Sequence, residues 1–352
     1  MTDKENNERI LEIYEKCIHS SYIDDVPENI KNIVDIIINC GQNAPIKCSI
    51  ASLFAKLLYP EWDTRQHQTK LQEKKIMSLR TFDRKFICQL LFEKGIYKSS
   101  TEYALTRSFE KSFPFNLDYG DVTNCRTFKS GAGEAFLELV DLINNQSQIK
   151  IENIIQLFIN KINKQSSLIE EIYQIGNNEK LLSNLLDEIL SIKTHGISVL
   201  PTLMITAIYE INIKFNTKWK AFRVDDLENH TTADKRSNKI GDIECYNDKK
   251  IICATEIKHN QEINNSTIKC FEGKIKGVDY DIKYKYIITS YMNQSFIDSK
   301  GIKVYSLMQF IHINLDILDV EHNIYIKELK DIIYNYKNIH NNLKCSVLEL
   351  FK

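Results

Sequence analysis

Apolar residues recur at helical spacing through most of the first 195 residues. Side chains at positions i, i+3, i+4 and i+7 fall on one face of a helix, so this repeat predicts amphipathic helices. The repeat is clearest in four segments, where we expect helices: 29–40, 50–59, 133–144 and 180–192. The stretch 111–123 contains the Pro, Gly and Asp residues that are typical of a loop.

The pattern of apolar positions changes after residue 195. The apolar segment 200–215 predicts a helix, because Pro201 lies near its first turn, where proline is tolerated. The short apolar runs that follow are rich in β-branched residues, which favour strands. We expect strands at 221–227, 240–246, 251–258, 284–290 and 302–307.

Turn and capping residues separate these runs. Asn247 and Asp248 predict a turn, and therefore a hairpin with a loop of roughly four residues. The segment 264–277 predicts a helix with an Asn or Ser N-cap and Gly277 at its end. The expected order is helix, strand, strand, strand, helix, strand (αβββαβ), which is a small α/β unit within an α+β protein. A last helical segment is expected at about 325–340.

Three regions follow from this order. Residues 1–195 are expected to be mainly helical, residues 196–320 to form the α/β unit, and residues 321–352 to form a helical extension. The whole chain of 352 residues is long enough to bury a substantial core. Its hydrophobic content of 43% and charged content of 26% are ordinary for a globular protein.

The nine Cys residues are scattered singly and include no C-x-x-C pair, so a zinc ribbon is not expected. Isolated Cys residues indicate buried thiols in a reducing compartment. The charged N-terminal segment does not resemble a signal peptide, and no run of 18 apolar residues is long enough to span a membrane. We therefore expect a cytoplasmic protein.

Charge is balanced overall but not locally. The formal net charge is −1, so a nucleic-acid-binding surface would require a local concentration of basic residues. Residues 56–111 contain 12 Lys or Arg against 7 Asp or Glu, and residues 214–303 contain 17 against 13. Such excesses can bind phosphates. The alternative is ordinary surface charge with intramolecular partners such as Asp63 and Asp83.

Two neighbouring expected strands carry acidic and basic residues inside apolar runs. Asp242 and Glu244 lie in the first run, and Glu256 and Lys258 lie in the second. Because strand side chains alternate between faces, each pair shares one face. If the two faces meet in the hairpin, Asp242 and Glu256 can bind one cation, and their hard oxygen ligands suit Mg²⁺. Lys258 would then position a metal-bound water or neutralise charge on a phosphate.

The short motif Glu-x-Lys is not specific, because it occurs four times in this chain. Only Glu256–Lys258 follows an apolar strand and is preceded by an Asp in another apolar strand. The alternative interpretation is a solvent-exposed hairpin face with a cross-strand salt bridge. Gly131 and Gly133 match neither a Walker loop nor a dinucleotide-binding motif, so nucleotide binding is not predicted there.

The pattern D…E-I-K in this expected order of elements resembles the PD-(D/E)xK nuclease superfamily. Within it, three blocks resemble type II restriction endonucleases of the SacI-like family: 63–87, 103–120 and 200–263, the last with HTTADKRSNKIGDIE and TEIKHNQEI. The resemblance implies a Mg²⁺-dependent DNA-cleaving enzyme with Asp242, Glu256 and Lys258 in catalytic positions. The chain departs from the superfamily at Gly241, where a Pro usually precedes the Asp.

The resemblance also implies supporting residues. A glutamate on the preceding helix often joins the metal ligands, which suggests Glu210, with a solvated helix charge as the alternative. Glu244 would be a further metal ligand, or it would contact one of the ligands and so influence the metal indirectly. The expected DNA contacts, to guanine edges or phosphates, are Arg65, Arg80, Arg84, Arg107, Lys235 and Arg236.

We therefore expect a type II restriction endonuclease that cuts double-stranded DNA. Residues 1–195 would recognise DNA and form a homodimer, since two-fold symmetry matches a symmetric site. A cognate DNA methyltransferase encoded nearby would be its functional partner. Two alternatives remain: a structure- or damage-specific repair or junction nuclease with the same core, and a DNA-binding protein without enzymatic activity.

Overall fold

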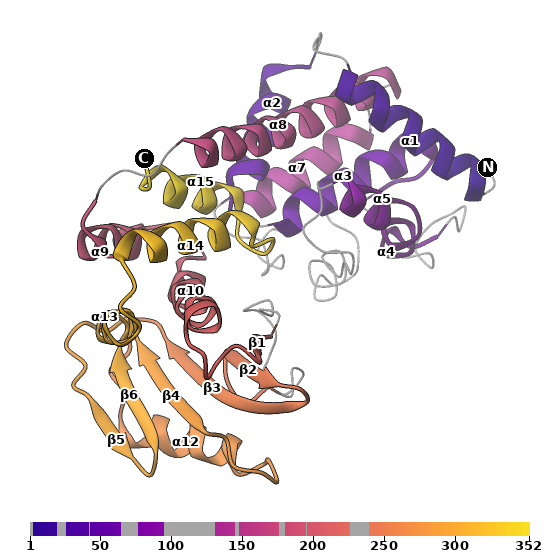
Figure 1. Cartoon of the computed structure of the whole chain (residues 1–352). Helices are drawn as coiled ribbons and strands as arrows, with labels where there is room; N and C mark the ends of the chain where they lie inside the picture. Colours follow the sequence, from indigo (N-terminus) through magenta and orange to yellow (C-terminus); the bar gives the residue numbers. More distant parts are fainter. Residues whose placement is uncertain are drawn as a thin grey trace. The chain divides into compact units, whose positions relative to one another are not determined.

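The protein is a mixture of helices and one mixed β-sheet (Figure 1). The computed structural model describes residues 3–19, 26–41, 43–64, 77–94, 131–144, 148–175, 180–194, 196–225 and 239–352. The chain divides into two compact units, Met1–Glu170 with His340–Asn342 and Glu171–Ile339 with Leu343–Lys352. The expected loop at 111–123 lies outside the described residues.

The first unit is helical in its described part. Its helices are α1 (Asp3–His19), α2 (Glu28–Asn39), α3 (Asn43–Leu58), α4 (Leu79–Phe82), α5 (Cys88–Glu93), α7 (Ala132–Asn144) and most of α8 (Gln148–Gln174), with a π-helical turn (Asp83–Ile87) before α5. Helix α3 is buried along nearly its whole length and packs against α2, α4 and α7, as an all-round apolar helix must. It begins at Asn43, well before the expected start at residue 50, because Pro45 fits within the first helical turn.

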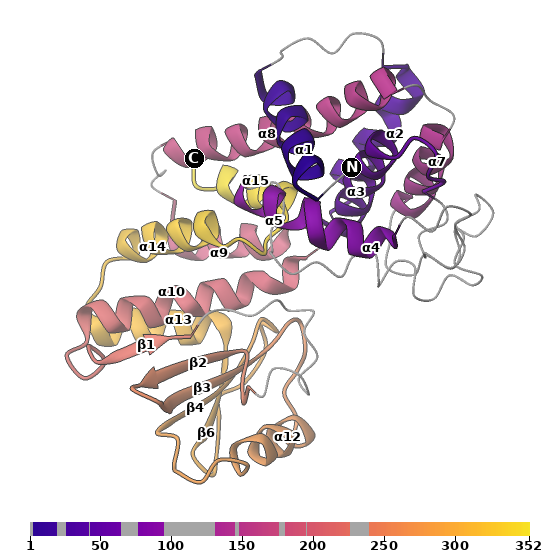
Figure 2. The same cartoon turned by 90° about the vertical axis from the view of Figure 1, so that its right-hand side faces the viewer.

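The second unit contains a six-stranded sheet with the order β1-β2-β3-β4-β6-β5. Strand β2 is antiparallel to β1 and β3, whereas β3, β4 and β6 run parallel and β5 is antiparallel to β6. Figure 2 labels β1, β2, β3, β4 and β6 in this order. The strands are β1 (Phe222–Val224), β2 (Ile243–Asn247), β3 (Lys250–Lys258), β4 (Tyr284–Thr289), β5 (Ile297–Ser299) and β6 (Ile302–Ser306).

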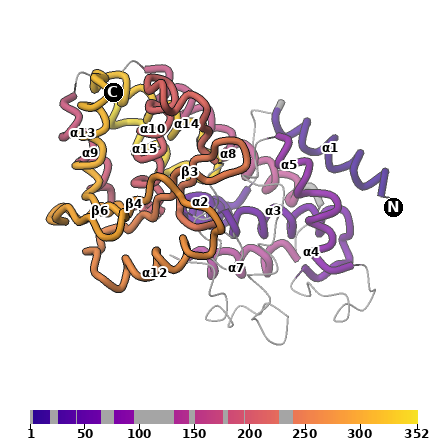
Figure 3. Tube along the Cα trace, turned by 60° about the horizontal axis from the view of Figure 1, so that its bottom comes forward, coloured from indigo at the N-terminus to yellow at the C-terminus, as the bar shows by residue number. Residues whose placement is uncertain are grey.

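The helices of the sheet unit cover both faces of the sheet. Helices α10 (Leu200–Phe215) and α13 (Leu307–Leu318) pack on one face, where α10 contacts β1 and α13 contacts β4 and β6. Helix α12 (Asn265–Ile275) buries Ile268 and Phe271 against Ala254 and Ile287 of the other face. The chain therefore runs α10, β1, β2, β3, α12, β4, which is the expected order of elements, and Figure 3 traces this path. Strand β5 and helix α13 were not expected.

The hairpin between β2 and β3 is tighter than the sequence indicated. The expectation of a loop of roughly four residues was wrong. The strands pair up to Asn247 and Lys250, so only Asp248 and Lys249 form the turn. Asp248 has a φ of 53°, a left-handed conformation that Asp tolerates better than most residues. The pairing shifts register between Cys245 and Tyr246, so the hairpin also contains an irregularity of the bulge type.

Three further helices complete the second unit: α9 (Leu182–Ser191), α14 (His322–Asn335) and α15 (Asn341–Glu349). Helix α10 packs against α14 as well as against the sheet. Among the described residues, Ile197–Phe215 is the one segment long and apolar enough to cross a membrane by length and composition, and 72% of the window tested is buried within the protein. Such burial is typical of the core helix of a soluble protein.

Helix α13 begins directly after β6 through a capping box. The Ser306 side chain accepts a hydrogen bond from the Gln309 backbone N–H, and the Gln309 side chain accepts one from the Ser306 backbone N–H. We predict that Ser306→Ala lowers the free energy of unfolding by about 1 kcal/mol, because it leaves an N-terminal donor of α13 unsatisfied. Urea denaturation checks this, with the exposed Ser295→Ala as the control, and equal stability of the two variants would contradict the role of the cap.

Candidate active site

The β2–β3 hairpin brings Asp242, Glu256 and Lys258 to one face of the sheet. Ile243 pairs with Thr255, so Asp242, which lies directly before β2, comes level with Glu256 on β3. Side chains alternate along a strand, so Asp242, Glu256 and Lys258 share the face that carries Ala254 and is covered by α12. The sequence analysis stated this meeting of the two strand faces as the condition for a shared cation site.

Asp242 is held by the neighbouring strand, and its pKa is shifted from the ordinary value of an aspartate. Its Oδ2 accepts a hydrogen bond from the Ile257 backbone N–H at 2.7 Å. Burial, and next the negative charge of Glu256, raise the pKa of Asp242 to about 6. The hydrogen bond from Ile257 and the charges of Lys258 and Lys274 oppose this shift without cancelling it. The pKa of Asp242 is therefore set first by its burial and then by the neighbouring carboxylate.

Glu256 is buried and forms ion pairs with two lysines. Its Oε1 lies 2.6 Å from Lys258 Nζ, and its Oε2 lies 3.1 Å from Lys274 Nζ. Lys274 comes from α12 and was not predicted to be a site residue. A signal was present in the sequence: Lys274 lies three residues after the buried Phe271, on the apolar face of the expected helix.

Gly241 allows the chain to approach β3 closely. A Cβ atom on Gly241 would lie 2.5 Å from the Thr255 carbonyl oxygen and 2.8 Å from its carbonyl carbon. Those are backbone atoms of the strand that carries Glu256, so they cannot move aside without shifting that strand. Any other residue, proline included, has a Cβ atom. Glycine at position 241 therefore has a local steric reason.

Glu244 lies on the same face as Asp242, but both of its carboxylate oxygens accept hydrogen bonds from other groups. It is 1% exposed, and its Oε1 accepts from the Ile240 backbone N–H at 2.6 Å. Its Oε2 accepts from the Tyr246 hydroxyl, also at 2.6 Å, and burial together with this bond raises the pKa of Tyr246. These bonds tie the segment before Asp242 to β2, so Glu244 has the geometry of a positioning residue.

The structure does not bring Glu210 to the Asp242–Glu256 pair. Glu210 is on α10, the helix whose Tyr209 hydroxyl bonds Thr255, a residue of the opposite strand face. Burial, and next the charge of Glu328 on α14, raise the pKa of Glu210. Among the described residues, no group of three or more His, Cys, Asp or Glu side chains is placed to hold a metal ion. Asp242 and Glu256 thus form a two-carboxylate site.

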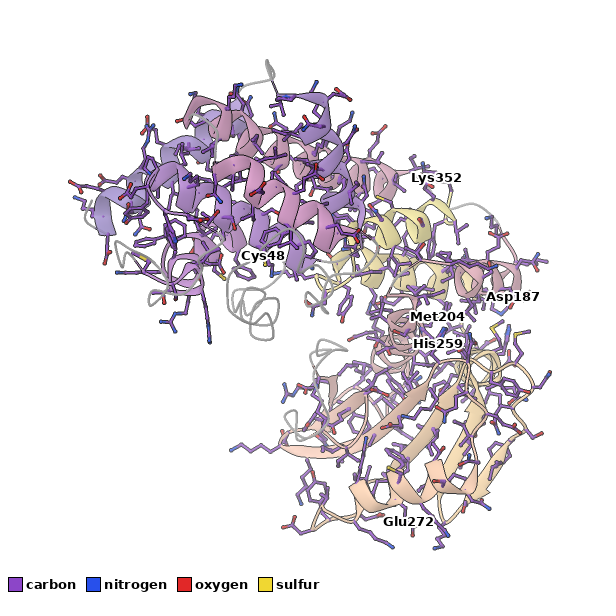
Figure 4. The ribbon with its side chains drawn as sticks, turned by 180° about the vertical axis from the view of Figure 1, so that it is seen from behind. Cys48, Asp187, Met204, His259, Glu272 and Lys352 are labelled. Atoms are coloured by element: carbon purple, nitrogen blue, oxygen red, sulfur yellow. The ribbon has the colours of Figure 1, made fainter. Side chains whose placement is uncertain are left out.

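The strand end that carries Lys258 is fastened to β4. Ser290 donates its backbone N–H to the Lys258 carbonyl at 3.1 Å, and its hydroxyl accepts from the Asn260 backbone N–H at 2.9 Å. The same hydroxyl lies 3.1 Å from Nδ1 of His259, which is labelled in Figure 4. Burial lowers the pKa of His259, which favours its neutral form. The Lys258 backbone is therefore held by the end of β4.

The candidate DNA contacts lie mostly outside the described part of the chain. Arg80 on α4 and Arg84 on the π-helical turn are described, and both are exposed on the first unit. Their positions, four residues apart on continuous helix, suit contact with one partner. The other four predicted contacts lie outside the described residues: Arg65, Arg107, Lys235 and Arg236.

The donor set fits a hard divalent cation such as Mg²⁺. Asp242 and Glu256 supply carboxylate oxygens from adjacent strand positions, and Mg²⁺ is commonly bound by one or two carboxylates with water completing its shell. Bound positive charge would also relieve the repulsion that raises the pKa of Asp242. Both oxygens of Glu256 are paired with lysines. Glu256 can therefore bind a cation only if at least one of these lysines moves away from it.

We predict that Gly241→Ala lowers the free energy of unfolding by about 1–3 kcal/mol, because the new methyl group displaces the β3 backbone at Thr255. The matched control is Gly273→Ala on α12, where a Cβ atom would meet nothing within 4 Å. That control is expected to gain about 0.5–1 kcal/mol, since alanine stabilises a helix interior. Denaturant unfolding measures both, and a Gly241 variant as stable as the control would contradict the proposed steric constraint.

We predict that Asp242→Asn stabilises the metal-free protein above neutral pH. The folded-state pKa of Asp242 is raised, so its protonated form contributes stability below about pH 4 that is lost as the pH rises through about 6. Asparagine resembles the protonated form at every pH and can still accept the bond from Ile257. Thermal unfolding in EDTA should show a gain of a few degrees at about pH 8 and little gain at about pH 4. A gain that does not change with pH would contradict this.

Comparison with known proteins does not assign the chain to a family. No protein-family model matches it, and no curated protein matches it. The family resemblance therefore rests on the three sequence blocks and on the residues of the hairpin.

Proposed function

We propose that the protein is a Mg²⁺-dependent endonuclease that hydrolyses phosphodiester bonds of double-stranded DNA. The observation that carries this proposal is the convergence of Asp242 and Glu256 on one hairpin face, with Lys258 two residues beyond Glu256 on β3. Two carboxylates and an amine in this order are the groups that metal-dependent phosphodiester hydrolysis requires.

The arrangement of elements supports a PD-(D/E)xK-type core. Helix α10 precedes three antiparallel strands, and α12 connects β3 to the parallel strand β4. The acidic and basic residues lie on the two central strands of that order, β2 and β3, as in the superfamily that the sequence resembles. Where that superfamily usually has a proline this chain has Gly241, whose close approach to β3 leaves no room for a Cβ atom.

Each residue has a chemical role in this proposal. Asp242 and Glu256 hold the cation, and Lys258 donates to the attacking water or to a phosphate oxygen on which negative charge develops. Mg²⁺, when bound, supplies positive charge to the phosphate and a bound water of lowered pKa. Glu244 and the Ser290 contacts hold the segments that carry Asp242 and Lys258. The Asp242 to Glu256 register sets the spacing of the two ligands.

The biological setting is proposed from the sequence resemblance. A restriction endonuclease would act as a homodimer on a symmetric site and would be accompanied by a methyltransferase that protects the host DNA. Arg80 and Arg84, both exposed, are the described candidates for contact with DNA bases or phosphates.

One observation favours a competing function. The ion pairs of Glu256 with Lys258 and Lys274 are what a charge-compensated hairpin face without enzymatic activity would contain. The protein would then bind DNA and leave the backbone intact. What supports a cation site instead is geometric, because Asp242 and Glu256 lie level across the hairpin and offer carboxylate oxygens on one face.

Incubation with unmethylated double-stranded DNA tests the proposal. With Mg²⁺ we expect fragments of fixed length, and with EDTA intact DNA. Asp242→Ala and Lys258→Ala should each lower the cleavage rate by roughly 10²–10³-fold, because each removes a ligand or a charge from the transition state. The exposed Lys269→Ala on α12 is the matched control and should cleave like the wild type.

The other outcomes separate the alternatives. Intact DNA in Mg²⁺, with binding retained, would favour the DNA-binding protein without enzymatic activity. Cleavage confined to branched or damaged DNA would favour a junction or repair nuclease. Cleavage that survives both alanine substitutions would contradict the assignment of Asp242 and Lys258.

A further inference from the structure

Lys274 places a second ammonium group at the candidate site. Its Nζ lies 3.1 Å from Glu256 Oε2, while Lys258 Nζ lies 2.6 Å from the other oxygen of the same carboxylate. Lys274 is also close enough to Asp242 to lower the pKa of that carboxyl. Two carboxylates and two ammonium groups therefore form one cluster whose formal charges cancel.

A divalent cation cannot bind this cluster unless the ion pairs of the cluster rearrange. A cation at the Asp242–Glu256 pair needs an oxygen of Glu256, and each of these oxygens already faces a lysine. The cation would also lie beside two ammonium groups, and like charges at such distances repel strongly where water is partly excluded. The repulsion falls if one lysine moves away and if an anion enters with the cation.

Lys274 is better placed to move than Lys258. The Lys258 backbone is bonded to Ser290 and lies within β3, two residues from Glu256 on the same strand. Lys274 belongs to another element, α12, and its Nζ lies farther from the Glu256 carboxylate, at 3.1 Å, than that of Lys258, at 2.6 Å. Its ammonium group can therefore exchange Glu256 for another anion without any movement of the sheet.

We propose that Lys274 is a phosphate-binding residue that leaves Glu256 for a DNA phosphodiester when a divalent cation binds the Asp242–Glu256 pair. This inference rests on the proposed nuclease function. In the free protein Lys274 competes with the cation for Glu256, and in the complex it contacts the backbone of the substrate. Cation and DNA therefore strengthen each other's binding, and by linkage each does so by the same factor.

The experiment measures Mn²⁺ binding to the full-length protein by its electron paramagnetic resonance signal, with and without a short duplex whose integrity is checked by gel. The variants are Lys274→Gln, which removes the charge, and Lys274→Arg, which keeps it. The matched control is Lys276→Gln on the same helix, where Lys276 pairs with Glu272, labelled in Figure 4, and not with Glu256.

Without DNA, Lys274→Gln should bind Mn²⁺ about tenfold more tightly than the wild type, since it removes a competing positive charge. Lys274→Arg and Lys276→Gln should stay within about twofold of the wild type, because each leaves a positive charge beside Glu256. Duplex DNA should strengthen Mn²⁺ binding to the wild type clearly more than to Lys274→Gln. These results together would support the exchange of Lys274 between Glu256 and phosphate.

Two results would overturn the inference in different ways. If Lys274→Gln binds Mn²⁺ and responds to DNA like Lys276→Gln, Lys274 is not part of the exchange, while the nuclease proposal stands. If Asp242→Asn binds Mn²⁺ as tightly as the wild type, no cation is held at this pair, and both the inference and the proposed function fail.

Discussion

The sheet unit is organised around two carboxylates that share one partly buried strand face. Asp242 and Glu256 come level across the β2–β3 hairpin, and the charge of Glu256 contributes to the raised pKa of Asp242. Burying like charges together is costly unless hydrogen bonds and opposite charges compensate them. Here the compensation comes from the Ile257 backbone N–H, from Lys258 and from Lys274. The pKa of Asp242 stays raised in spite of it, chiefly because the carboxyl is buried. Two carboxylates on one face still offer the hard oxygen ligands that suit a divalent cation.

The face of β3 opposite Glu256 packs against α10. On the face opposite Glu256, Thr255 bonds the buried Tyr209 hydroxyl of α10, and Cys253 lies against the same hydroxyl at 3.6 Å. Burial raises the pKa of Tyr209, so this contact stays neutral. Alternation along one strand thus lets β3 pack against α12 on the face with the charged cluster and against α10 on the other.

The sequence predicted the hairpin better than its surroundings. Asp242, Glu256 and Lys258 were recognisable because charge inside an apolar strand run is unusual, and period-two alternation then fixed their common face. Lys274 was missed because its contact with Glu256 depends on how α12 crosses the sheet, which sequence spacing alone does not specify. The two-residue turn was missed because the twist of the flanking strands places Asp248 in the left-handed conformation. The residue composition of the turn does not indicate this conformation.

Every residue of the candidate site's charged cluster, together with Gly241 and Glu244, lies in the single stretch 239–274. The residues of the site are therefore encoded by one short, continuous segment of the chain. A substitution in the helices outside this stretch leaves every one of these residues, and their spacing along the chain, unchanged. The charged cluster can therefore be moved or altered as a unit by changing one segment of 36 residues, 239–274.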